Sequence, residues 1–170
     1  HNRWFGRTVI YSDRRFTYEE AQQVIETGEG DLKEEILTLN RLAQKMRAQR
    51  FRNGAISFAR KEAKFRLDEK GKPLGVYFKE QKEANQLIEE FMLLANRQVA
   101  EFVGRKRGKS GQRTMVYRVH DEPNSDKLLR FQSFILRFGY FFKADKGKAV
   151  AKAMNRLMEK IKGRVEENVI

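Results

Sequence analysis

Carboxylates carry most of the chemistry that this sequence could perform. Its 170 residues contain no cysteine and only two histidines, His1 and His120, which excludes thiol catalysis, disulfides and a histidine-rich metal site. The run of His120, Asp121 and Glu122 could hold a metal ion or transfer a proton. Because no second acidic cluster completes a two-metal site of the kind that cleaves phosphodiesters, we interpret this run as structural.

A polar stripe follows the most strongly predicted helix, 82–103. Asn85, Glu89 and Asn96 are separated by four and seven residues, which places them on one side of an otherwise apolar helix. A carboxylate among apolar neighbours needs a partner, because an unpaired buried charge is strongly destabilising. Glu89 could accept a hydrogen bond from a ribose 2′-hydroxyl or from an arginine of the same fold, and the spacing alone favours the structural pairing.

Aromatic residues often stand next to bases in this chain, which has 13 Phe, 5 Tyr and 1 Trp. Such interleaving suits base stacking and phosphate contact on single-stranded nucleic acid. Most of these aromatics have the spacing of core residues. We expect two of them outside the core: Tyr18, in the first turn of a helix, and Phe58, which is followed by the bases Arg60 and Lys61.

The charge balance points to a polyanionic partner. The chain has 36 Lys and Arg against 23 Asp and Glu, a formal net charge of +13, and such a field attracts nucleic acid and releases its counterions. The alternative is a basic surface that is merely solvated or faces a ribosome. The sequence has no P-loop, dinucleotide fingerprint, zinc spacing or Gly-x-Ser-x-Gly elbow, so the residues alone predict a nucleic-acid-binding domain without catalysis.

The length is that of one domain or part of one, and 40% hydrophobic residues suffice for a core. No run approaches the roughly 18 consecutive apolar residues of a membrane helix, so we expect no membrane contact. The absence of cysteine suits a reducing compartment, and we expect a cytoplasmic location.

Apolar spacing and cap residues predict five helices and five strands. Thr17 and Glu20 have the spacing of a capping box for the first helix, and the second helix has a predicted core stripe of Leu32, Ile36, Leu39, Leu42 and Met46. The helices are expected from Thr17 to the Gly28–Gly30 stop, over about 31–50, over 82–103, from 123–125 to the Gly139 stop, and over about 146–162.

The strands are expected at 7–11, 55–58, 64–68, 74–78 and 115–119. The strands 64–68 and 74–78 are expected to form a hairpin that has one buried side. The predicted fold is α+β, with antiparallel strands packed against the long central helix 82–103 and several further helices.

Four runs of residues stand out in the chain. They are Asp-Arg-Arg-Phe-Thr-Tyr-Glu-Glu-Ala at 13–21, Gly-Ala-Ile-Ser-Phe at 54–58 with Glu-Ala-Lys-Phe at 62–65, Glu-Ala-Asn-Gln-Leu-Ile-Glu-Glu-Phe-Met-Leu-Leu-Ala-Asn at 83–96, and Tyr-Arg-Val-His-Asp-Glu-Pro at 117–123. Together these runs resemble the middle of the catalytic domain of the ribonuclease II / ribonuclease R family, with ribonuclease R the closer match. They occur in the family's order and span most of the chain.

The resemblance implies a processive exoribonuclease that uses magnesium to hydrolyse single-stranded RNA from its 3′ end to nucleoside 5′-monophosphates. The family's metal-binding aspartates lie upstream of the matched region, and its Thr-Ser-Pro-Ile-Arg stretch lies downstream. Both are missing from this sequence. Residues 1–170 are therefore expected to be a central fragment of the RNB catalytic domain that is inactive alone and binds no metal of its own.

The resemblance also implies roles for three residues. Tyr18 and Glu89 match a pair that reads the ribose 2′-hydroxyl and so selects RNA over DNA, and Phe58 matches a phenylalanine that stacks on the terminal bases. With Arg60 and Lys61, these residues form the predicted RNA-binding set, and the expected partner is single-stranded RNA rather than DNA or a membrane. The alternative is a noncatalytic RNA- or ribosome-binding module; a DNA-binding module is disfavoured because a 2′-hydroxyl reader has no role on DNA.

Overall fold

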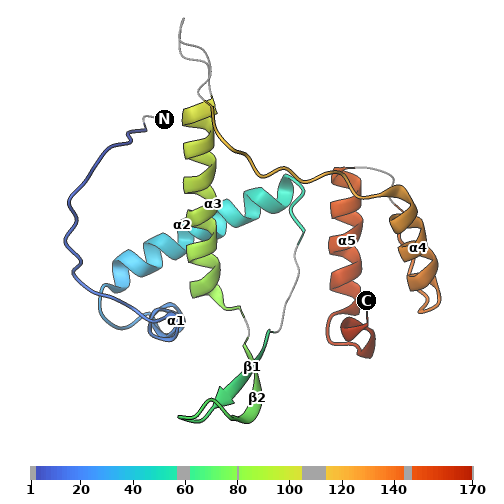
Figure 1. Cartoon of the computed structure of the whole chain (residues 1–170), viewed down its shortest axis with the longest axis horizontal. Coiled ribbons are helices and arrows are strands. Elements are labelled where there is room, and N and C mark those ends of the chain that lie inside the picture. The colour runs from blue at the N-terminus through green and yellow to red at the C-terminus, as the bar shows by residue number, and fades with distance from the viewer. Residues whose placement is uncertain (1–2, 57–61, 80, 105–113, 144–146, 170) are drawn as a thin grey trace, which may run out of the picture.

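The computed structural model of the chain describes residues 3–56, 62–79, 81–104, 114–143 and 147–169 (Figure 1). Within these ranges the α+β class is confirmed, and all five predicted helices are present to within about two residues of their expected ends. The elements in chain order are α1 (Tyr18–Thr27), α2 (Lys33–Arg52), β1 (Glu62–Leu67), β2 (Pro73–Lys79), α3 (Glu83–Gly104), α4 (Ser125–Leu136), α5 (Lys148–Ile161) and the short 3-10 helix η2 (Val165–Asn168).

Helices α1, α2 and α3 form one packed group in which α1 and α2 both lie against α3, and Figure 1 shows α2 crossing it. The residues buried between them are Val24, Ile36, Ala43, Ala84 and Leu87. Those from α3 belong to its first two turns. Farther along α3, predicted core residues such as Leu94 and Val99 are exposed, so only the first part of this helix is covered as the spacing predicted.

The buried face of α2 differs from the predicted one. Ile36 is buried, but Leu39 and Leu42 are exposed, and the covered stripe runs instead through Asn40 and Ala43. Both stripes have helical spacing, so periodicity could not separate them. The interaction with α3 favours the second stripe, because Asn40 Nδ2 donates a hydrogen bond to Glu83 Oε2 at 3.3 Å.

Strands β1 and β2 form the predicted antiparallel hairpin, with Phe65 opposite Val76 and Ala63 opposite Phe78. Its turn is closed by Asp68, whose Oδ1 accepts hydrogen bonds from the backbone N–H groups of Lys70 at 2.9 Å and Lys72 at 2.8 Å. Gly71 adopts φ 79° in this turn, a conformation that favours glycine.

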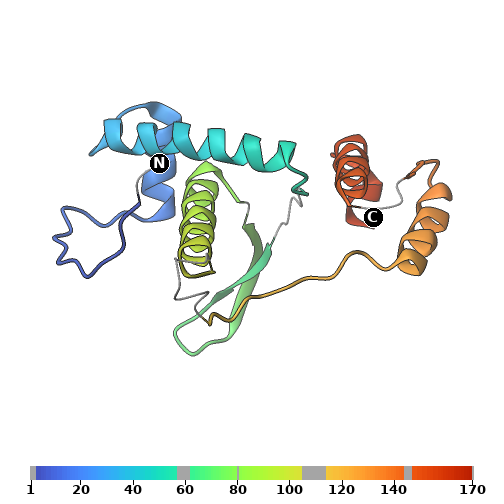
Figure 2. The same ribbon diagram turned by 90° about the horizontal axis from the view of Figure 1, so that it is seen from above.

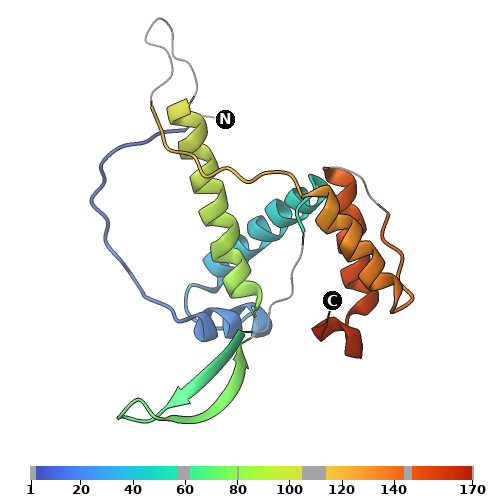
Figure 3. The same cartoon turned by 45° about the vertical axis from the view of Figure 1, so that its right-hand side comes forward.

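The prediction that this hairpin packs against the long helix with one buried side is wrong. Figures 1 and 3 show it extending away from the helices, and among the described residues neither strand contacts α3. Phe65, Val76 and Phe78 are all exposed. Period-two alternation indicates a strand with two different faces, but it does not identify what covers the apolar one.

Helices α4 and α5 form a second packed group and lie side by side in Figures 1 and 3. Their core contains Ile135, Phe142, Val150, Leu157 and Ile161, and the ring of Phe131 meets Phe142 edge-on at 5.6 Å. The two groups are linked where Asn155 Nδ2 of α5 donates to the Ala55 carbonyl oxygen at 2.8 Å.

The strands predicted at 7–11 and 115–119 are wrong, because both segments are extended but unpaired. The first runs as a separate trace beside the helices (Figure 2), and its start is held to the end of α3 by an ion pair between Arg3 and Glu101 at 3.0 Å. The second leaves α3 near Tyr117, whose hydroxyl donates to the Ala100 carbonyl at 3.5 Å. A β-rich composition makes a strand only where a neighbouring strand supplies the hydrogen bonds.

The strand predicted at 55–58 is irregular at 55–56, and the rest lies outside the described residues.

In the part of the chain that the structure describes, no helix combines the length and apolar character needed to cross a membrane.

Candidate functional site

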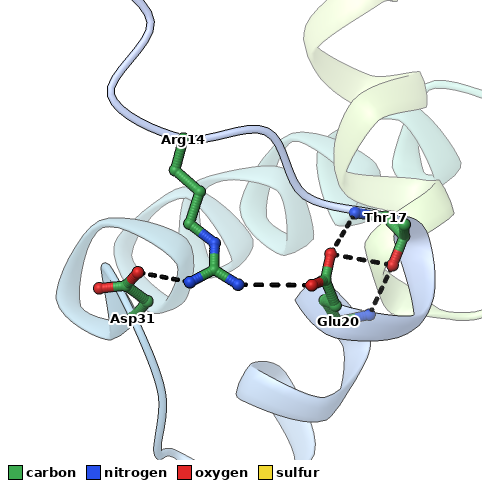
Figure 4. A network of polar contacts seen from close by, with 4 residues as sticks. All are labelled: Arg14, Thr17, Glu20 and Asp31. Atoms are coloured by element: carbon green, nitrogen blue, oxygen red, sulfur yellow. Dashed lines mark hydrogen bonds and ion pairs between the residues drawn. The ribbon is translucent and has the colours of Figure 1, made fainter.

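Tyr18 is the first residue of α1, and a capping box fixes the point at which its helix begins. The Thr17 N–H donates to Glu20 Oε2 at 2.7 Å, and the Glu20 N–H donates back to Thr17 Oγ1 at 3.2 Å (Figure 4). This reciprocal pairing satisfies two backbone donors that have no partner inside the helix. Tyr18 follows directly with 43% of its surface exposed, so its backbone is anchored while its ring is partly accessible.

Arg14 joins the capping box to the start of α2. Its guanidinium donates to Glu20 Oε1 at 3.3 Å and also pairs with Asp31 (Figure 4). The hydrogen bonds from Thr17 and the charge of Arg14 lower the pKa of Glu20, and the hydrogen bond to Asp31 raises the pKa of Arg14. The turn before Tyr18 is therefore held by a charge-assisted network rather than by apolar packing.

A buried glutamine attaches α1 to the first turn of α3. Gln22 Oε1 accepts the backbone N–H of Ala84 at 2.9 Å, while its Nε2 donates to Glu26 Oε1 at 3.0 Å. The same Glu26 oxygen pairs with Lys82 Nζ at 3.2 Å, and the hydrogen bonds from Gln22 and Lys82 lower the pKa of Glu26. The helices that carry Tyr18 and Glu89 are thus fixed to each other by a specific polar contact.

Glu89 lies on α3 beside an arginine of α2. Arg50 Nη2 is 3.2 Å from Glu89 Oε1, and the Glu89 side chain is 43% exposed. The structure therefore supplies the arginine partner that the spacing had favoured. It also leaves Glu89 Oε2 without a hydrogen bond among the described residues, so the carboxylate keeps an accessible acceptor.

The predicted polar stripe is not buried along its length. Asn85 Oδ1 accepts the backbone N–H of Lys82 at 3.2 Å at the start of α3, and Asn96 is exposed. Neither asparagine makes a hydrogen bond to Glu89 in the described part of the chain.

The charged residue that α3 does bury is Glu90, which the sequence analysis missed. Its side chain is only 3% exposed, and Arg50 holds it with Nε at 2.9 Å and Nη2 at 2.5 Å from Oε1. Glu90 continues the three-residue step of the buried Ala84 and Leu87, and that spacing could have identified it. Arg50 lies 40 residues away, and no local pattern points to it.

Three of the predicted RNA-binding residues, Phe58, Arg60 and Lys61, lie outside the described residues. The segment before them is fixed at Ala55 by the hydrogen bond from Asn155. The structure therefore brings together the helices of Tyr18 and Glu89 and leaves the predicted stacking residue and its two bases as sequence-based predictions.

The described residues do not fit the magnesium ion that the resemblance implies. They contain no group of three or more His, Asp or Glu side chains arranged to hold a metal ion. His120, Asp121 and Glu122 lie exposed on the unpaired segment before α4. We therefore derive no chemical step through a metal from these residues.

Comparison with known proteins identifies the family. The sequence matches the RNB domain along residues 1–170. It is 38% identical over 91% of the chain to DIS3-like exonuclease 2 of Schizosaccharomyces pombe, 30% identical over 99% to ribonuclease R 1 of Lactococcus lactis, and 32% identical over 81% to the inactive exonuclease DIS3L2 of Arabidopsis thaliana. The chain belongs to the RNB domain family, as the four sequence runs predicted.

The fold agrees with this assignment. The structure of Mycoplasma genitalium RNase R, in complex with ribose-methylated single-stranded RNA, superposes on 91% of the chain with a TM-score of 0.72 and 21% identity. The chain spans 18% of the fission-yeast relative, 21% of the Lactococcus relative and 24% of the Mycoplasma chain. The match therefore covers about a fifth to a quarter of each of these proteins.

Proposed function

We propose that residues 1–170 form the central part of an RNB catalytic domain, within a polypeptide that degrades single-stranded RNA processively from the 3′ end to nucleoside 5′-monophosphates. The observation that carries this proposal is the RNB match along the whole chain. The names of the relatives support it, since the yeast protein is an exonuclease and the Lactococcus protein a ribonuclease.

In this proposal the helical group α1–α3 forms part of the wall of an RNA channel. The partly exposed Tyr18 and Glu89 belong to helices that Gln22 ties together at the first turn of α3. A carboxylate oxygen such as Glu89 Oε2 can accept a hydrogen bond from a ribose 2′-hydroxyl, a group that DNA lacks. Phe58 would stack on bases, with Arg60 and Lys61 contacting phosphates.

Magnesium is part of the proposal for the whole enzyme, and the family resemblance assigns its ligands to aspartates upstream of these residues. We accordingly expect the 170 residues alone to lack hydrolytic activity. A cytoplasmic location remains a further element of the proposal, supported by the cysteine-free composition.

The proposal is tested with the longest natural polypeptide that contains these residues and a 5′-labelled single-stranded RNA oligomer. We expect conversion of the full-length oligomer to a short 5′-labelled end product without accumulation of intermediates, and release of nucleoside 5′-monophosphates detected by chromatography, both dependent on magnesium and abolished by EDTA. The same-sequence DNA oligomer is the control and should remain intact. RNA binding without any release of mononucleotides would contradict the proposed activity.

A noncatalytic RNA-binding module is the second candidate, and one observation favours it. The Arabidopsis relative is described as an inactive exonuclease although it is 32% identical to this chain, so membership of the family does not by itself ensure catalysis. The same assay distinguishes the two, because a noncatalytic module binds the RNA oligomer and returns it intact.

A further inference from the structure

We propose that Arg50 is a positioning residue that orients Glu89 for its hydrogen bond to the ribose, with the buried Glu90 as its anchor. This inference rests on the proposed function, because it names a residue that serves the RNA selectivity proposed there. It concerns one guanidinium that contacts two adjacent carboxylates of α3.

The anchor is the contact between Arg50 and Glu90. Two nitrogens of Arg50 reach Glu90 Oε1, Nε at 2.9 Å and Nη2 at 2.5 Å, and Nε also lies 3.3 Å from Oε2. The Glu90 side chain is 3% exposed, so releasing it would leave a buried charge unpaired. The planar fork of Arg50 is therefore held in one orientation.

The aromatic ring of Phe51 further restricts the guanidinium. The Arg50 Cζ atom lies 5.4 Å from the centre of this ring, within the distance at which a cation is attracted to an aromatic face. Arg47 stacks on the same ring at 4.6 Å but contacts neither carboxylate. The neighbouring arginine thus shares the packing environment of Arg50 without its ion pairs.

Arg50 makes one further contact, to Glu89, and this contact orients the Glu89 carboxylate. Consecutive helical residues project about 100° apart, so Glu89 points away from the buried side on which Glu90 lies. Arg50 Nη2 still reaches Glu89 Oε1 at 3.2 Å. One oxygen of Glu89 is thereby occupied, and the carboxylate is oriented with Oε2 left to accept a 2′-hydroxyl.

The positioning role requires both the positive charge of Arg50 and the planar arrangement of its guanidinium nitrogens. Lysine in place of Arg50 keeps the positive charge but provides one nitrogen, which cannot hold Glu90 and Glu89 in the same geometry. A merely structural arginine would affect the binding of RNA and DNA alike. A positioning arginine would affect only the difference between them, because DNA has no 2′-hydroxyl to meet Glu89.

The experiment uses the longest natural polypeptide that contains these residues. Fluorescence anisotropy measures its affinity for single-stranded RNA and for DNA of the same sequence, in EDTA so that neither is cleaved. The variants are Arg50→Lys, Glu89→Gln and their combination, with Arg47→Lys as the matched control. We expect Arg50→Lys to lower the RNA-to-DNA affinity ratio about tenfold, the size of effect typical for one hydrogen bond to a charged group. Affinity for DNA should be unchanged, the control should keep the wild-type ratio, and the combined variant should lose no more than Glu89→Gln alone.

Three outcomes would overturn the proposal, and they are distinguishable. If Glu89→Gln lowers the ratio and Arg50→Lys does not, Arg50 only balances the charge of Glu90. If neither variant changes the ratio of a protein that prefers RNA, Glu89 does not read the ribose and Arg50 has nothing to position, while the proposed exonuclease activity is unaffected. If the wild type shows no RNA preference, the ribose contact proposed for Glu89 fails together with the inference, and the exonuclease activity is judged separately by the release of mononucleotides. Should Arg50→Lys not fold, Glu90→Gln weakens the same anchor with a side chain of equal size, and an unchanged ratio in that variant would also reject the proposal.

Discussion

At the scale of single residues, the chain uses a few polar side chains to fix positions that apolar packing leaves open. The capping box before Tyr18 is the clearest example, because Thr17 and Glu20 satisfy each other's backbone N–H groups. Its spacing is local, so the sequence predicted it correctly. The second arginine contact in this network, from Arg14 to Asp31, joins the residues before α1 to the turn before α2 and has no local signature.

Replacement of Thr17 by alanine tests the contribution of this cap. We expect the Thr17→Ala change to lower the free energy of unfolding by about 1 kcal/mol, because the Glu20 N–H loses its acceptor. Urea unfolding followed by far-ultraviolet circular dichroism measures the difference. Thr17→Ser keeps the hydroxyl and serves as the control; equal losses in both variants would show that the methyl group, not the cap, matters.

The capping glutamate also predicts a dependence of stability on pH. The pKa of Glu20 is lowered below its ordinary value of 4.5 by the hydrogen bonds from Thr17. A carboxyl whose pKa is lower in the folded state contributes stability above the pKa of the unfolded state, and this contribution is lost as the pH falls through the folded pKa. We expect the difference in Tm between the wild type and Glu20→Gln to be full at pH 7 and to shrink as the pH falls below 4.5.

Glu19 provides the matched control for this titration. It lies in the same helical turn and makes no side-chain hydrogen bond in the described part of the chain. Glu19→Gln removes the same charge from the helix N-terminus without removing a cap. If both variants gave the same pH dependence of Tm, the effect would come from the helix dipole rather than from the capping box.

At the scale of elements, helices could be predicted from sequence and their partners could not. Caps and spacing located all five helices, because both signals are carried by residues within a few positions of each other. The choice of buried face on α2 depended on α3, 40 or more residues away, and was wrong at Leu39 and Leu42. The segments 7–11 and 115–119 failed as strands for the same reason, since a strand exists only with a partner.

The contact between α2 and α3 predicts a large effect of removing Arg50. Arg50→Ala leaves the Glu90 carboxylate buried without its partner, so we expect a loss of about 3 kcal/mol in the free energy of unfolding. The double change Arg50→Met and Glu90→Leu replaces both charges by apolar groups of similar size and should recover most of that loss. Urea denaturation of the single, double and Arg47→Ala variants makes the comparison.

Either of two results would contradict this account of the interface. A loss in Arg50→Ala no greater than in Arg47→Ala would mean that Glu90 finds another partner or accepts a proton at little cost. A double variant as unstable as the single one would mean that the apolar aliphatic part of Arg50, rather than its charge, supports α3.

At the scale of the whole molecule, we expect one set of exposed groups to determine the affinity for nucleic acid and another to determine the preference for RNA over DNA. The net charge of +13 is spread along the chain, and exposed bases such as Lys152, Arg156 and Lys160 of α5 make no ion pair with described residues. Such charges bind any polyanion and release counterions from it. Selectivity for RNA is instead expected at Glu89 together with Tyr18, because their proposed contact requires a 2′-hydroxyl.

This separation predicts how binding responds to salt. We expect the logarithm of the association constant for single-stranded RNA to fall linearly with the logarithm of salt concentration, with a slope of about −0.7 for each neutralised phosphate. Glu89→Gln should abolish the preference for RNA over DNA and leave this slope unchanged. Lys152→Gln combined with Lys160→Gln should make the slope shallower for RNA and DNA equally, and keep the preference. Fluorescence anisotropy over a salt series measures both the slope and the preference for RNA. A change of slope in Glu89→Gln would show that this carboxylate acts through the overall electrostatic field of the protein rather than through contact with the sugar.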